Sequence, residues 1–173
     1  RLLAWEKSSP VMASLTKALG QYRQEEAADA LVQWLTGSDR PYWAQAQALL
    51  GLGRQRGDRY LNKLEAAAEA PSWWSWVQRA AYLAIGQTRT KDAFAYLAER
   101  VGDRSIPLST RGNIFMGLAE SVQWLDKGAR ENARERLESV LLEKDERVQL
   151  AAARALGRLG EAGSADKLDG LGM

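Results

Sequence analysis

Apolar residues recur along this chain at spacings of three and four positions, which place them on one face of an α-helix. The clearest of these stripes centre on a leucine, and the central leucines are Leu31, Leu64, Leu97 and Leu168. The first three lie 33 residues apart. No stretch of useful length alternates between apolar and polar residues, so the pattern predicts helices and no β-sheet.

A glycine stands eleven residues before each central leucine. Gly20, Gly53 and Gly86 are 33 residues apart, Gly157 repeats the pattern, and Gly117 repeats it more loosely. A fixed period in this range indicates a repeat architecture. Each glycine ends an apolar segment, and glycine accepts the left-handed conformation in which many helices end. We therefore expect these ladder glycines to close a first helix, and the leucine stripe to form a second one.

The chain thus consists of about five helix pairs in a single domain that covers residues 1–173. The expected units are residues 9–36, 40–70, 72–102, 106–143 and 145–172. All four prolines fall near the start of a first helix, where a missing N–H is tolerated; they are Pro10, Pro41, Pro71 and Pro107. Candidate caps of the second helices are Asp58, Thr90 and Ser164.

The fourth unit breaks the spacing, because its apolar stripe comes nine residues late. The extra residues fall within 118–130, around Trp124. They predict either a lengthened first helix or a longer loop, and a neutral insertion explains either, since surface loops tolerate added length.

A helix pair cannot bury its apolar stripe alone, so neighbouring pairs stack around a continuous core. The predicted fold is an all-α, right-handed superhelical α-solenoid, with the second helices as its inner layer. Residues 1–8 are assigned to a preceding element. Because the chain begins with Arg1, we expect it to be part of a longer protein.

Composition excludes several kinds of chemistry. The chain has no histidine and no cysteine, so it offers neither imidazole nor thiolate as a base, nucleophile or metal ligand. Its 24 basic and 22 acidic side chains give a net charge of only +2, and no half carries a basic excess suited to nucleic acid. No apolar run approaches the ~20 residues of a membrane span. We expect a soluble protein that binds neither nucleic acid nor membrane.

The fifth unit, DERVQLAAARALGRLGEAGSADKL from Asp145 to Leu168, resembles a HEAT-like repeat. It has an acidic residue, a valine, a run of alanines, Ala-Leu-Gly and a second segment with a central leucine. It departs from that family at Val148-Gln149, where arginine usually follows valine. The resemblance extends over nearly the whole chain and implies a scaffold of HEAT-like helical hairpins.

A narrower resemblance begins at SWWSWVQRAAYLAIGQTR, residues 72–89, and continues through the extended fourth unit to residues 138–160. These segments resemble the C-terminal helical-repeat region of bacterial aminopeptidase N-like (gluzincin) zinc metallopeptidases. The resemblance implies a non-catalytic tail that packs on an upstream catalytic domain and limits which peptides enter it. Zinc and the catalytic residues would lie upstream, and this chain would carry no cofactor.

The chain has seven tryptophans, and some of them are candidates for an interaction surface, because tryptophan is enriched at the centres of protein interfaces. The candidate residues are Tyr42, Trp43, Trp73, Trp74, Trp76 and Trp124. Residues 73 and 76 can share a helix face. The cluster is therefore either an exposed docking patch or two core tryptophans with a third partly exposed. Trp34 occupies a stripe position and is expected in the core.

The polar positions of the second helices carry both signs of charge at spacings of three and four, which is typical of a solvated helix face. This pattern argues against the basic channel of HEAT-like DNA glycosylases. We therefore expect a non-catalytic interaction domain that packs on a peptidase catalytic part and borders substrate access. The alternative is an independent scaffold that binds a protein or peptide partner on its concave face.

Overall fold

Helices fill the described part of this computed structural model, which comprises residues 8–37 and 39–160. Four pairs follow one another, and a ninth helix ends the described region: α2 (Ser9–Leu19) and α3 (Glu25–Leu35), α4 (Tyr42–Gly53) and α5 (Leu61–Glu69), α6 (Trp76–Thr88) and α7 (Lys91–Arg100), α8 (Leu108–Ser121) and α9 (Lys127–Val140), then α10 (Glu146–Leu159). Two short 3-10 helices, η1 (Trp73–Ser75) and η2 (Val122–Trp124), precede α6 and follow α8. These residues contain no strand, so the predicted all-α solenoid is confirmed.

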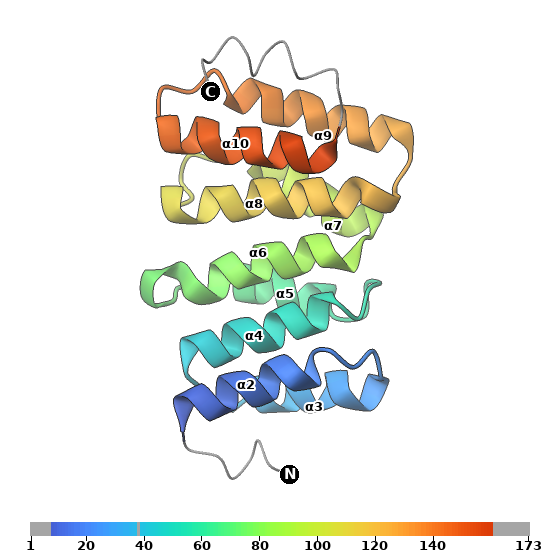
Figure 1. Ribbon diagram of the computed structural model, residues 1–173, viewed down its shortest axis with the longest axis vertical. Coiled ribbons are helices and arrows are strands. Elements are labelled where there is room, and N and C mark those ends of the chain that lie inside the picture. Colours follow the sequence, from blue (N-terminus) through green and yellow to red (C-terminus); the bar gives the residue numbers. More distant parts are fainter. Residues whose placement is uncertain (1–7, 38, 161–173) are drawn as a thin grey trace.

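The first helices of the pairs, α2, α4, α6, α8 and α10, stack side by side in chain order (Figure 1). We call them the first row, and α3, α5, α7 and α9 the second row. Each second-row helix packs more extensively on the first helix of the following pair than on that of its own pair. The central leucines Leu31, Leu64 and Leu97 are fully buried at this contact, as the apolar pattern predicts. Leu168 lies outside the described residues.

Four of the five ladder glycines are helix-contact residues, namely Gly20, Gly53, Gly86 and Gly117, and the prediction that the ladder glycines form left-handed helix ends is wrong. A Cβ atom at Gly20 would lie 2.6 Å from the Cα of Gly51, and one at Gly86 would lie 2.6 Å from the Cα of Gly117. A Cβ at Gly53 would lie 2.7 Å from the Cα of Ala84. Real Cβ atoms do not approach a backbone so closely, so glycine here lets neighbouring first-row helices touch. The only glycines with positive φ among the described residues are Gly57 and Gly160.

The second row is more widely spaced than the first. Adjacent first-row helices pack along their length, whereas within the described residues no two second-row helices pack on each other to a comparable extent. The second-row helices therefore meet mainly first-row helices, and the expectation that the second helices form the inner layer stays a prediction.

The ends of the helices agree in part with the sequence. Thr90 caps α7 by accepting a hydrogen bond at its Oγ1 from the Ala93 N–H, at 3.2 Å. Asp58 does not cap α5, because that helix starts only at Leu61 and its cap position is Tyr60. Ser164 lies outside the described residues. The extra length of the fourth unit extends its first helix, since α8 continues into η2.

Candidate functional site

Exposed aromatic side chains gather where two neighbouring first-row helices begin. Tyr42 and Trp43 are the first residues of α4, and Trp76 is the first residue of α6. With Pro41 they line a groove of about 380 Å³, and we call these four residues the aromatic groove. The three aromatic residues are 45%, 47% and 48% exposed. The structure thus brings Trp76 beside Tyr42 and Trp43, which lie more than 30 positions earlier in the sequence.

A left-handed turn of the backbone determines where α6 begins. Trp74 and Ser75 have φ angles of 52° and 56°, although neither is glycine. Such a conformation costs about 1–3 kcal/mol per residue and persists only where surrounding contacts impose it. Ser72 holds the turn, because its Oγ accepts a hydrogen bond from the Val77 N–H at 3.1 Å. Trp76 is thereby fixed as the first residue of the helix, beside the groove.

A cation borders the groove at Trp76. The guanidinium carbon of Arg79 lies 5.8 Å from the centre of the Trp76 ring. The Nε of Arg79 donates a hydrogen bond to the Asn113 Oδ1 of α8 at 3.2 Å, which ties its position to the next first-row helix. The groove is therefore apolar in its lining and positive at one edge.

The sequence leaves open whether the cluster of Trp73, Trp74 and Trp76 is an exposed docking patch or lies partly in the core. The exposed fractions of the side chains decide this for Trp74 and Trp76. Trp76 is half-exposed and Trp74 is 74% exposed, so neither is a core residue. The side chain of Trp73 lies outside the described part of the structure. Trp34 is buried against the cation of Arg40, whose guanidinium lies 5.1 Å from its ring, and its predicted place in the core is confirmed.

Trp124 does not join the aromatic groove. It ends η2, beyond the C-terminal end of α8, whereas the groove lies at the N-terminal ends of α4 and α6. Its side chain is 66% exposed. The guanidinium of Arg89 lies 4.8 Å from the centre of its ring. The predicted surface therefore divides into two places, one at the N-terminal ends and one at the C-terminal ends of first-row helices.

Several charged side chains on the second row and on the turns before it pair between neighbouring units. Arg59 of the second unit pairs with Glu25 and Asp29 of the first. Arg100 of α7 pairs with Glu69 of α5 at 2.9 Å. Pairs within one helix, such as Lys127 with Glu131 at 3.5 Å, also occur. The charge pattern seen in the sequence thus joins adjacent units as well as adjacent turns.

The Glu69 pair includes a tyrosine. The Tyr96 hydroxyl donates a hydrogen bond to Glu69 Oε1 at 2.7 Å, and this bond is the main reason that the pKa of Glu69 is lowered. Burial, and then the hydrogen bond to Glu69, raise the pKa of Tyr96 above its ordinary value. Arg100 stacks on the Tyr96 ring at 3.5 Å from its centre. These groups satisfy one another, so the cluster is a structural contact and not an exposed acid or base.

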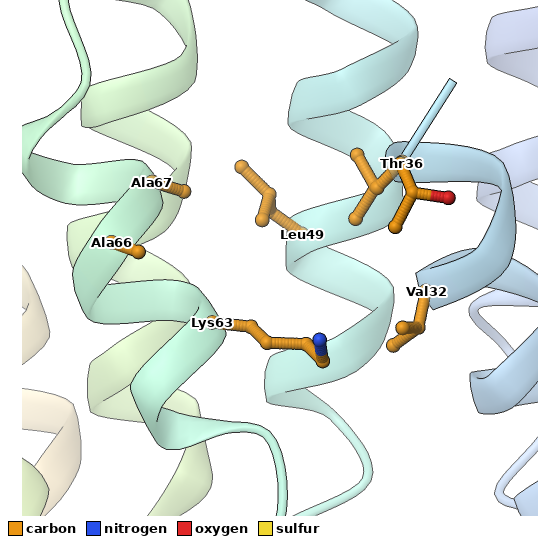
Figure 2. Close-up of a pocket in the computed structure, with 7 residues that line it drawn as sticks. Val32, Thr36, Leu49, Lys63, Ala66 and Ala67 are labelled. Atoms are coloured by element: carbon orange, nitrogen blue, oxygen red, sulfur yellow. The ribbon is translucent and has the colours of Figure 1, made fainter.

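A second groove opens between α3 and α5, where the second row is widely spaced. It has a volume of about 240 Å³, and its lining is mainly apolar. Leu49 of α4 lies between the two helices, and Lys63 extends from α5 into the gap (Figure 2). A groove of this size accommodates an apolar side chain, with a cation beside it.

Neither groove contains a set of metal ligands. Within residues 8–37 and 39–160, no group of three or more His, Cys, Asp or Glu side chains is placed to hold a metal ion. In the same part of the chain, no helix is both long and apolar enough to cross a membrane.

Comparison with known proteins agrees with the stacked helix pairs. Residues 37–114 match the family model for HEAT repeats, a segment of 78 residues that runs from just before α4 into α8. This segment is therefore similar to HEAT repeats, and the described helices around it form a helical repeat domain. No curated protein sequence matches the chain. HEAT repeats are typically non-catalytic and commonly mediate protein interactions. The two grooves and the exposed Trp124 are the candidate interaction surfaces of the described residues.

Proposed function

We propose that this HEAT-like domain is a non-catalytic docking module that binds another protein domain through its aromatic groove. The observation that carries the proposal is the clustering of Tyr42, Trp43 and Trp76, each about half-exposed, around one groove. Tryptophan, tyrosine and arginine dominate the energetic centres of protein interfaces. Burying exposed apolar surface stabilises a complex by roughly 25 cal/mol per Å² before the costs of association are subtracted.

The rigidity of the groove supports this role. Its two walls are the starts of α4 and α6, and these two helices pack extensively on each other. Both walls are thus fixed before a partner arrives. A preformed site loses little conformational entropy on binding, so more of the contact energy remains as affinity.

The partner in this proposal is the catalytic part of an aminopeptidase N-like zinc metallopeptidase, encoded upstream of this domain. The support is the resemblance of residues 72–89 and 138–160 to the C-terminal region of such enzymes, and residues 72–89 include Trp74 and Trp76. The domain would pack on the catalytic part and border substrate access. Zinc would be bound upstream, since this chain has no histidine.

Two measurements test the proposal. The coding sequence that precedes Arg1 should encode a His-Glu-x-x-His segment, and its absence would eliminate the peptidase as partner. Calorimetric titration of the upstream polypeptide with the domain should show binding that the double variant W43S and W76S weakens by at least about tenfold. Tyr22 and Leu142 are exposed apolar residues elsewhere, so the double variant Y22S and L142S serves as the control. Equal losses in both variants would refute a specific role for the groove.

The alternative is an independent scaffold that binds a protein partner along its second helices. The groove between α3 and α5 favours it, because Leu49, Ala67 and Val32 leave an apolar space open to a side chain. Replacing Ala66 by Trp would fill this space and leave the aromatic groove intact. Loss of partner binding in A66W with retention in W43S and W76S would support the scaffold and contradict the docking module.

A further inference from the structure

Three arginines follow the ladder glycines at the same place in successive units. Arg23, Arg56 and Arg89 each stand three residues after a ladder glycine and are therefore 33 positions apart. Each lies in the segment that leaves the C-terminal end of a first-row helix: Arg23 after α2, Arg56 after α4, and Arg89 as the cap residue of α6.

Hydrogen bonds between the turns bring these arginines onto one edge of the molecule. The Gln55 side chain donates to the Tyr22 carbonyl at 2.8 Å, which joins the turn of Arg56 to that of Arg23. The Gly57 N–H donates to the Thr88 carbonyl at 2.9 Å, which joins it to the turn of Arg89. The three arginines thus follow one another along the C-terminal ends of α2, α4 and α6.

The exposed ring of Trp124 lies against two of these arginines. Its centre is 4.8 Å from the guanidinium carbon of Arg89 and 5.9 Å from that of Arg56. An aromatic face attracts a guanidinium, but it does not neutralise its charge. We call Arg23, Arg56, Arg89 and Trp124 the arginine edge.

The positive charge of this edge is only partly compensated. Glu120 accepts hydrogen bonds from Arg89 at 2.8 Å and from Arg158 at 2.7 Å, so one carboxylate serves two guanidinium groups. No carboxylate of the described residues forms an ion pair with Arg23 or Arg56. The nearby charge of Arg23, and then that of Arg89, lower the pKa of Arg56. The negative ends of the helices favour a single cation at each turn, but they do not account for a row of cations that repel one another.

We propose that the arginine edge binds an acidic segment of a partner protein. Guanidinium groups bind carboxylates through two parallel hydrogen bonds, and Arg23 and Arg56 are exposed with those donors available. The Trp124 ring supplies an apolar contact for the side chains between the carboxylates. Because Arg89 already pairs with Glu120, the two exposed arginines match a segment with about two acidic residues. These arginines are too few for a nucleic-acid duplex, whose binding requires the neutralisation of many phosphates.

This inference is independent of the aromatic groove. The groove lies at the start of α4 and the arginine edge follows its end, and a helix of 12 residues spans about 18 Å. The two surfaces therefore do not share a residue, and substitutions at one leave the other unchanged.

Fluorescence anisotropy with a labelled peptide of about ten glutamates tests the proposal at a salt concentration of about 50 mM. The domain should bind the peptide, and the double variant R23S and R56S should bind it at least about tenfold more weakly. The control variant R104S and R154S removes two exposed arginines outside the edge and should change affinity by less than about twofold. All four arginines are exposed, and circular dichroism should show that both variants remain folded.

Three outcomes would overturn the proposal. In the first, the domain does not bind the peptide. In the second, both double variants lose the same amount of affinity, which would indicate that the peptide is attracted by net charge alone. In the third, a labelled DNA duplex binds more tightly than the peptide and R23S and R56S abolish that binding, which would assign the edge to nucleic acid.

Discussion

Replacing Gly86 by alanine tests whether the ladder glycines hold the first row together. Gly86 lies within α6, and the Cβ added by the substitution would lie 2.6 Å from the Cα and 2.7 Å from the carbonyl carbon of Gly117 in α8. These are backbone atoms, so no side chain can rotate to make room. The two helices must separate along a contact that both bury.

Two opposing contributions determine the size of the effect. Overpacking a buried contact costs about 1–3 kcal/mol. Alanine stabilises a helix by about 1 kcal/mol relative to glycine. Because the obstructing atoms are backbone, we expect the cost at the upper end of its range. G86A should therefore lower the free energy of unfolding by about 1–2 kcal/mol.

Gly157 provides a matched control, because it occupies the same place in the repeat and also lies within a helix, α10. No atom of the described residues would come within 4 Å of its added Cβ. Only the gain in helix propensity remains, so G157A should raise the free energy of unfolding by about 0.5–1 kcal/mol. Urea denaturation followed by far-UV circular dichroism measures both values. Shifts of the same sign and similar size in the two variants would refute the argument from backbone contact.

Three further predictions concern the contacts between and within units. Arg111 is buried and bonds Glu143 at 2.6 Å, and this bond is the main reason that the Glu143 pKa is lowered. The pair therefore stabilises the fold above the ordinary carboxyl pKa of 4.5, and this contribution is lost as the pH falls through the lowered value. E143Q should cost about 1–3 kcal/mol at neutral pH. The difference from the unmodified chain should narrow in urea denaturation toward acid pH; a difference independent of pH would contradict the assignment. T90A should lower the free energy of unfolding by about 1 kcal/mol, because it removes the cap of α7. T90S keeps a hydroxyl at this position and should retain most of the stabilisation. Equal stabilities of the two variants would show that the hydroxyl does not stabilise the helix. Small apolar probes should enter the groove beside Leu49 in the unmodified chain and shift the NMR signals of the Leu49 methyl groups. A66W should fill the groove, so the same probes should leave these signals unchanged. Unchanged signals in the unmodified chain would show that the groove is not accessible.

The sequence predicted the helix pairs well, because helix formation here follows from local patterns. Apolar spacing locates the buried leucines, and the prolines lie at or close before the starts of first helices, as with Pro41 and Pro107 directly before α4 and α8. The period of the sequence locates the ladder glycines, but the prediction that they form left-handed helix ends is wrong. A glycine at a helix end and a glycine at a helix contact produce the same spacing, and only the neighbouring helix distinguishes them.

The candidate site was less predictable, since it depends on where a helix begins and on what lies beside it. The left-handed turn at Trp74 and Ser75 contains no glycine, so its sequence gave no sign of it. This turn leaves Trp76 half-exposed, and the contact of α4 with α6 sets it beside Trp43. The arginines, by contrast, have a signal that sequence reasoning missed, because Arg23, Arg56 and Arg89 repeat with the period of the glycines.

The close approach of the first-row helices explains why both candidate surfaces lie at helix ends. The middle of α4 consists largely of small buried residues, including Ala44, Ala48 and Gly51, because its neighbours touch it there. Large polar and aromatic side chains are therefore placed at its start and after its end. The C-terminal ends carry arginines, because a cation is favoured beside the negative end of a helix. A stack with this packing thus acquires two edges with different chemistry, an aromatic edge at the helix starts and a basic edge at the helix ends, held at a fixed distance by the helices between them.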